Sequence, residues 1–338
     1  MIHVGVDLHQ RFCYMTAVEA RGKVVQAGVV ANEKRALQRY FRQFGGQRVQ
    51  VAVEACGFWP GFREAVEAEV ERLVLVHPQR VKAIASAKLK NDRVDSATLA
   101  DLLRCDFLPE SWKADRKTQA RRQQVRLRTT LVRQRTRLKN QVHAVLHQQG
   151  LRSPVTDLFG QRGRQWLKQV KLPEKARSAM EVCCRLLDHY TQEIEQQNRQ
   201  LSVEARKDER VQWLTTIPGI GEFSALMLLA EIGDIGRFRD GQALCSYAGL
   251  VPRVRESAGK AWRGGITRQG SSYLRWIMVE AAQVATRCSP AARRYYERLR
   301  RKKHPHVARV ALARKLLRAV YALLRDGVQF AESEFAAV

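Results

Sequence analysis

Two short segments near the N-terminus are rich in valine and almost free of charge, and they constrain the fold most strongly. They are residues 2–8 (IHVGVDL) and 49–56 (VQVAVEAC). Apolar runs of this length with many β-branched residues are typical of buried strands. Further strands are predicted at 22–30 and 72–77, and helices at 33–44, 60–70 and 93–104. Because strands and helices are mixed, residues 1–109 are predicted to form an α/β domain around one sheet.

Residues 110–207 differ in composition and are predicted to form a helical arm. Between residues 113 and 139 there are eleven Lys or Arg and a single acid, Asp115. Apolar residues at helical spacing share one face, so the pattern predicts an amphipathic helix with a basic outer side. These apolar residues are Leu131, Leu138, Val142 and Val145. Arg126, Arg133 and Arg137 on the basic side are predicted to bind nucleic acid.

A second long helix is predicted to begin near Glu174. Apolar residues recur every seven positions along it, which is the spacing of a coiled coil. They are Met180, Leu187, Ile194 and Leu201. The two long helices are expected to form either an antiparallel hairpin or a dimer arm.

Residues 208–338 begin with a turn between two apolar segments that contains Gly219 and Gly221. Such a turn resembles a helix-hairpin-helix module, whose free backbone N–H groups can meet a phosphate. A tight helix–helix turn explains the same residues equally well. The domain is expected to be mainly helical.

The charge balance points to a polyanionic partner. The chain has 60 Lys plus Arg against 33 Asp plus Glu, a formal net charge of +27. Nucleic acid is the leading candidate, and no apolar run is long enough to span a bilayer. The seven cysteines form no CxxC pair and the N-terminus lacks a signal-peptide pattern. A reducing, cytoplasmic location without structural zinc is therefore expected.

Four acids are candidate metal ligands. Asp7 and Glu54 lie inside apolar strands, where an unpaired charge is costly to bury. Asp92 and Asp95 are one helical turn apart and share a face. Asp92 and Asp95 could instead simply stabilise the N-terminus of a helix, where negative charge is favourable. Together, the four oxygen ligands predict a Mg²⁺ site for phosphoryl transfer, with Mn²⁺ as the other candidate.

Ser257 lies in a predicted loop that is rich in Gly and Arg. The surrounding cations are Arg253, Arg255, Lys260, Arg263 and Arg268. Since no His–Asp pair is close in the sequence, the arginines are expected to hold a phosphate that the serine attacks. The alternative is a simple turn in a basic phosphate-binding loop.

The order of these motifs resembles the transposases of the insertion sequence 110 family over nearly the whole chain. The motifs are VGVDLH, VAVEACGFW, KNDRVDSATLADLL, IPGIGEFSA, LCSYAGLVPRVRESAGK and GITRQGSSYLRWIMVEAA. The resemblance implies a RuvC-like (RNase-H-like) DEDD domain, a coiled-coil arm and a transposase domain with a catalytic serine. The family's acids match Asp7, Glu54, Asp92 and Asp95, and its serine matches Ser257, which is followed here by Ala258.

The same resemblance implies partners that composition cannot show. Family members are similar to recombinases guided by a noncoding bridge RNA that pairs with target and donor DNA. Their active site joins domains of different subunits, so a dimer, and a tetramer in the DNA complex, are expected.

Three classes of function fit these residues. An RNA-guided DNA recombinase uses both the acids and the serine. A metal-dependent nuclease, such as a junction resolvase, uses the acids while Ser257 only binds phosphate. A non-catalytic scaffold uses neither, and the acids in apolar strands count against it. A covalent protein–DNA adduct separates the first class from the second.

Overall fold

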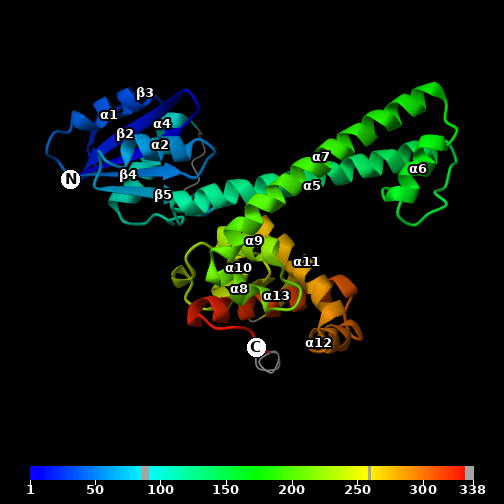
Figure 1. Ribbon diagram of the computed structural model, residues 1–338. Coiled ribbons are helices and arrows are strands. Elements are labelled where there is room, and N and C mark those ends of the chain that lie inside the picture. The colour runs from blue at the N-terminus through cyan, green and yellow to red at the C-terminus, as the bar shows by residue number, and fades with distance from the viewer. Residues whose placement is uncertain (85–90, 258–259, 332–338) are drawn as a thin grey trace. The chain divides into compact units, whose positions relative to one another are not determined.

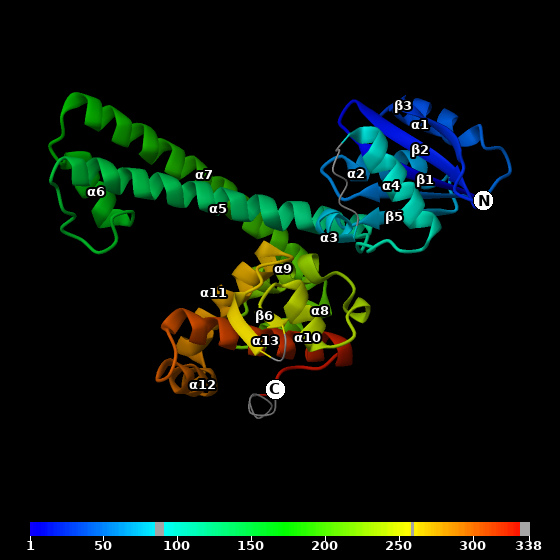
Figure 2. The same ribbon diagram turned by 180° about the vertical axis from the view of Figure 1, so that it is seen from behind.

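The computed structural model describes residues 1–84, 91–257 and 260–331, with only the backbone for 254–257 and 260–263. It divides into two compact units, Met1–Lys113 and Ala114–Val338 (Figures 1 and 2). The boundary predicted after residue 109 lies near this division. The predicted arm belongs to the same unit as the C-terminal helices.

The N-terminal unit is built on a five-stranded sheet in the order β3-β2-β1-β4-β5. Antiparallel pairing joins β1 to β2 and β2 to β3, whereas β4 pairs with β1 and β5 in parallel. The strands are β1 (Ile2–Leu8), β2 (Phe12–Glu19), β3 (Val24–Ala31), β4 (Val49–Glu54) and β5 (Arg72–Val76). The predicted α/β class is confirmed, and β2 is a strand that the sequence reading did not include.

Helices cover both faces of this sheet. Helices α1 (Lys34–Arg42) and α2 (Trp59–Val66) pack on one face, and α3 (Pro78–Ile84) and α4 (Asp92–Arg104) on the other. Gly5 of β1 makes the second packing possible, because a Cβ there would lie 1.9 Å from the carbonyl oxygen of Ser96 in α4. The hydroxyls of Thr16 and Ser96 form a buried 2.7 Å hydrogen bond beside it. Helix α4 is thereby held against β1 and β2.

The arm consists of two antiparallel helices, α5 (Arg116–Gln148) and α7 (Glu174–Arg206), with α6 (Gln161–Gln169) between them in the chain. Their direction follows from contacts that pair Arg128 with Asn198 and Gln141 with Cys183. The four heptad residues of α7 are each at most 3% exposed. Of the two predicted arrangements, the structure therefore has the antiparallel hairpin, and α5 already covers the apolar seam within one chain.

The remaining helices form one apolar core. They are α8 (Glu209–Thr215), α9 (Glu222–Ile232), the 3-10 helix η1 (Ile235–Arg237), α10 (Gly241–Tyr247), α11 (Ser272–Cys288), α12 (Pro290–Arg300) and α13 (Pro305–Asp326). Helix α9 is buried on all sides, and Val125 of α5 and Leu201 of α7 join the same core. The arm is therefore continuous with these helices. Within the described part of the chain, no helix has the length and hydropathy needed to cross a bilayer.

Candidate active site

The sheet brings Asp7 and Glu54 to one edge. The parallel register of β1 and β4 pairs Val6 with Val53, so the two acids follow the last paired positions of neighbouring strands. Parallel strands end at the same edge of a sheet, and residues at matching positions point to the same face. Asp7 also follows Gly5 by two residues, so its side chain points to the face that α4 covers.

Helix α4 begins at this edge with Asp92 in its first turn. Its N-cap is Asn91, whose side-chain oxygen accepts a 2.8 Å hydrogen bond from the Val94 amide. Asp92 and Asp95 both lie in the first turn, where the helix dipole favours negative charge. Because Asn91 fills the capping position, neither aspartate is needed as the cap.

His9 completes a compact group of metal-ligand atoms with Asp7 and Asp92. Its Nε2 lies 3.3 Å from Oδ2 of Asp7 and 3.4 Å from Oδ2 of Asp92. One ligand atom from each of the three side chains lies within 4.8 Å of the others. Nε2 is buried and makes no well-formed hydrogen bond among the described residues. The imidazole packs on Phe12, with ring centroids 4.8 Å apart.

The sequence reading missed His9, although a signal for it was present. In extended backbone, side chains two residues apart point to the same side. His9 follows Asp7 by two residues, so the spacing alone indicates that both side chains face α4. The Asn32 side chain holds the backbone here by donating a 2.9 Å hydrogen bond to the carbonyl of His9.

The surroundings disfavour a charged Asp7. Burial raises the pKa of Asp7, and the nearby carboxylates of Asp92 and Asp95 raise it further, while His9 opposes the shift. Like charges held this close persist where a cation neutralises them. The hard oxygen donors suit a divalent cation such as Mg²⁺ or Mn²⁺, and imidazole is also accepted by transition metals. The residues therefore fit a metal ion.

The predicted acids do not all belong to this compact group. Asp95 is close enough to affect the charge of Asp7. Glu54 is next to Asp7 by strand register. Neither contributes an atom to the 4.8 Å group, which contains His9 instead.

The segment around Ser257 is an antiparallel β-hairpin rather than the loop expected from its Gly and Arg content. Its strands are β6 (Pro252–Ser257) and β7 (Lys260–Ile266), and Ser257 pairs with Lys260 in the backbone register. Ala258 and Gly259 lie outside the described residues, as does the side chain of Ser257. The same holds for the side chains of three predicted phosphate contacts, Arg255, Lys260 and Arg263.

The two remaining predicted arginines of this segment are described in full. Nη2 of Arg253 donates a 3.5 Å hydrogen bond to the carbonyl of Thr267. Arg268 follows β7 with a backbone φ of 55°, a left-handed conformation that is uncommon for residues other than glycine.

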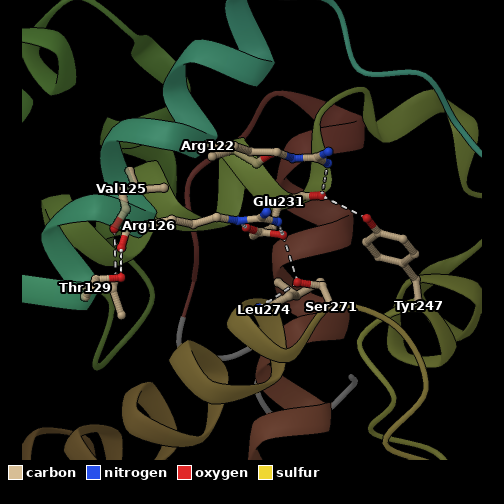
Figure 3. Close-up of polar contacts among 10 residues, drawn as sticks. Arg122, Val125, Arg126, Thr129, Glu231, Tyr247, Ser271 and Leu274 are labelled. Atoms are coloured by element: carbon tan, nitrogen blue, oxygen red, sulfur yellow. Dashed lines mark hydrogen bonds and ion pairs between the residues drawn. The ribbon is translucent and has the colours of Figure 1, made fainter. Parts of the chain in front are cut away.

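The predicted nucleic-acid contacts on α5 differ in their surroundings. Arg126 donates from Nε and Nη2 to the carboxylate of buried Glu231, at 2.8 and 2.9 Å (Figure 3). Arg133 lies over the rings of Tyr273 and Trp276, at 5.3 and 5.6 Å from their centroids. Arg137 is exposed. Arg126 therefore has a structural partner, whereas Arg133 and Arg137 are both exposed.

The two glycines of the predicted phosphate-binding turn, Gly219 and Gly221, differ in how closely they are packed. Gly219 has φ +87° and a Cβ there would lie 2.2 Å from the carbonyl oxygen of Ala281 in α11, so this residue is required by packing. Gly221 precedes α9 and has open space around its Cα. The structure thus explains Gly219 by the close packing of a tight helix–helix turn.

Comparisons with known proteins agree with this architecture. A family model described as "Transposase IS116/IS110/IS902 family" matches residues 211–297, and one described as "Transposase" (DEDD_Tnp_IS110) matches residues 4–150. A probable family 20 transposase of Pseudomonas aeruginosa is 30% identical over 95% of this chain and 96% of its own length. The transposase for insertion sequence element IS1328 of Yersinia enterocolitica is 28% identical, covering 83% of this chain and 85% of that protein.

A third similar protein is named for a different rearrangement of DNA. The pilin gene-inverting protein of Moraxella bovis is 34% identical over 36% of this chain and 39% of its own length. Taken together, the matches define a DNA transposase. Its N-terminal unit is α/β and its C-terminal unit is helical. The chain belongs to the IS110/IS116/IS902 family of insertion-element transposases.

Proposed function

We propose that this transposase is an RNA-guided DNA recombinase that cuts and rejoins strands through a covalent link between Ser257 and DNA. A divalent metal ion held by Asp7, Glu54, Asp92 and Asp95 assists it. The observation that carries the proposal is the convergence of Asp7 and Asp92, from a strand and a helix, on Nε2 of His9.

The sheet supports an RNase-H-like assignment for the N-terminal unit. An antiparallel β1-β2-β3 meander followed by β4 and β5 parallel to β1 gives the order expected for that fold. Acids on β1, at the end of β4 and at the start of a later helix fit the DEDD pattern.

When bound, the metal ion supplies Lewis-acid stabilisation of the phosphate and of the oxygens that attack and leave. The carboxylates of Asp7 and Asp92 would hold it, with Glu54 and Asp95 as further ligands. His9 either adds a ligand or orients Asp7 from 3.3 Å. Helix α4 fixes the geometry, because its close packing on Gly5 leaves little freedom to the first turn.

Ser257 supplies the second part of the chemistry. Its hydroxyl oxygen attacks a DNA phosphorus and forms a serine–phosphate ester, while the bond to one DNA oxygen breaks. The serine proton is lost and the departing DNA oxygen gains a proton. Attack by a new DNA hydroxyl reverses the exchange, so one phosphoester replaces another and no external energy source is needed. Arginines of the hairpin stabilise the negative charge that develops on the phosphate.

The proposed partners are double-stranded target and donor DNA, the noncoding RNA and further copies of this chain. The net charge of +27 supports binding to polyanions. The RNA guide and the tetramer rest on the family resemblance alone. The heptad seam is not an argument for self-association, since α5 covers it.

A metal-dependent nuclease without a covalent step is the second candidate. In that case, water attacks at the metal site and leaves free DNA ends. Similarity to a protein named for gene inversion favours the recombinase, because inversion requires that cut strands be rejoined.

Trapping a covalent adduct tests the proposal. Protein, RNA and a nicked DNA substrate are incubated with Mg²⁺, denatured and analysed for protein that migrates with DNA. The adduct is expected with the unaltered chain and with Ser246→Ala, which changes an exposed serine of α10. It should be absent with Ser257→Ala. Recombination at the normal rate by Ser257→Ala would show that this serine is not the nucleophile.

A further inference from the structure

A cavity of about 650 Å³ lies in the C-terminal unit between α13 and the base of the β6–β7 hairpin. Its lining includes Pro252 and Gly264 of the hairpin and Val307 and Val310 of α13. One part of the wall is apolar, with Leu250 and Ile266. The volume is within the range of about 300–1,000 Å³ that is usual for small-molecule sites.

The rest of the wall is basic. Arg314, Lys315 and Arg318 contribute to it from about one turn of α13, and Arg268 and Lys303 from other segments. Among the described residues that line the cavity, there is no Asp or Glu. Cations gathered without a carboxylate in the wall are suited to an anion, and arginine suits a phosphate in particular.

Two of these side chains are positioned by neighbours that leave them facing the cavity. Nη2 of Arg314 donates a 2.6 Å hydrogen bond to Oε1 of Gln242. Nζ of Lys315 lies 5.1 Å from the ring centroid of Tyr295, which also lines the cavity. Burial lowers the pKa of Lys315, and the positive charges of Arg318 and Arg298 lower it further. The cluster is therefore crowded with like charge.

Arg268 provides an independent indication of function. It lines the cavity with φ 55°, and its amide donates a 3.2 Å hydrogen bond to the carbonyl of Gly249. A residue other than glycine in this conformation is strained, and such strain is concentrated at binding and catalytic sites.

We propose that this cavity binds one unpaired nucleotide of a DNA strand, with its phosphate on Arg314, Lys315 and Arg318 and its base on the apolar wall. A phosphate alone would need no apolar wall, and a base pair within a stacked duplex could not enter a cavity of this size. The assignment to DNA rests on the proposed function, because the hairpin above the cavity carries Ser257.

The distance along the hairpin defines which nucleotide is bound. Strand β6 has 6 residues, which corresponds to about 20 Å at about 3.3 Å per residue. The cavity is at the Pro252 end and Ser257 is at the other. The bound nucleotide therefore flanks the cut phosphate rather than carrying it, and the cavity holds the strand in place during exchange.

Fluorescence anisotropy with the full chain tests the proposal. The probes are a labelled thymidine strand of about 12 nucleotides, a uridine strand of the same length and a blunt DNA duplex. Lys315→Gln with Arg318→Gln should weaken binding of the DNA strand about tenfold and reduce its log–log salt slope by about 0.7, for the one phosphate that these cations contact. Duplex affinity should stay unchanged.

A matched control removes two charges elsewhere. Arg301→Gln with Arg309→Gln changes one α12 cap residue and one α13 residue that do not line the cavity. This pair should leave the difference between strand and duplex unaltered. An equal loss for strand and duplex, or an equal loss with the control pair, would show general electrostatic attraction and overturn the proposal.

Val310→Trp tests the apolar wall without a change of charge. It should fill the cavity and reduce strand affinity several-fold, while normal duplex binding shows that the chain is folded. Normal strand binding by this variant, or a loss confined to the uridine strand, would overturn the assignment. The adduct assay on Ser257→Ala is independent of these titrations, so a failure of the serine mechanism and a failure of the cavity are distinguishable.

Discussion

Asp7 and Glu231 are both acids within apolar segments of the sequence, one in each unit, and their carboxylates have opposite kinds of neighbour. Glu231 is 1% exposed, and both of its carboxylate oxygens accept from Arg126. The hydroxyl of Ser271 donates to the same carboxylate at 2.8 Å. The negative charge of Glu231 is therefore neutralised by Arg126, and these contacts join α5, α9 and α11 (Figure 3).

Asp7 is 26% exposed and has no arginine or lysine among the groups that shift its pKa. Its neighbours are His9 and two further aspartates, and its pKa is raised. The comparison shows that an acid within an apolar segment does not identify a site. The neighbouring side chains identify the site. An acid next to an arginine of the same chain forms a structural ion pair, whereas an acid next to further acids can bind a metal cation.

The largest expected effect is on strand cleavage at the N-terminal site. Asp7→Ala or Asp92→Ala should reduce the initial rate in Mg²⁺ by about 10³-fold or more, because charge stabilisation by a metal ion is worth several kcal/mol. Asp101→Ala is the matched control, since this exposed acid of α4 pairs with Arg104 instead. A normal rate with Asp92→Ala would remove that residue from the site.

The next effect is on stability in the C-terminal unit. Arg126→Ala should lower the free energy of unfolding by about 3–5 kcal/mol, because Glu231 would be left buried without its cation. Arg137→Ala, at an exposed position of the same helix, should change it by less than about 0.5 kcal/mol. Urea unfolding followed by circular dichroism measures both. Equal stabilities would mean that the Arg126 pair has no structural role.

This prediction also changes how nucleic-acid binding by α5 should be tested. Substitution of Arg126 disturbs the core, so weaker binding by such a variant has two explanations. Arg137 is exposed and lacks this complication. It is therefore the better position for measuring a salt-dependent contact.

Sequence reasoning predicted the elements whose patterns are repeated and strong. The valine-rich strands β1 and β4 and the seven-residue repeat of α7 are buried as their patterns indicate. Strand β2 was missed because its burial arises from pairing between β1 and β3, which a local pattern does not contain. The β6–β7 hairpin was missed because its Arg and Gly content is typical of a loop.

The candidate site was also predictable only where a local sequence pattern indicates it. Asp7 and Glu54 could be found because charge is unusual within an apolar strand. The role of His9 depends on the approach of α4 to Gly5, which is a tertiary contact. Glu231 carries the same local signal as Asp7, and only the position of Arg126 on a distant helix distinguishes the two.

The smallest effect completes the comparison between the two kinds of acid. In metal-free buffer with EDTA, Asp7→Asn should raise the free energy of unfolding slightly, as measured by urea unfolding. The reason is that burial and the charges of Asp92 and Asp95 disfavour an ionised Asp7. Asp115→Asn provides the opposite case, because the Asp115 carboxylate caps α5 through Thr118 and its pKa is lowered by that hydrogen bond. The Asn side chain can still cap the helix, but the loss of negative charge at its N-terminus should destabilise this variant by about 0.3–1 kcal/mol. If Asp7→Asn were destabilised as well, Asp7 would be a structural acid like Glu231, and the assignment of a metal site at this edge of the sheet would fail.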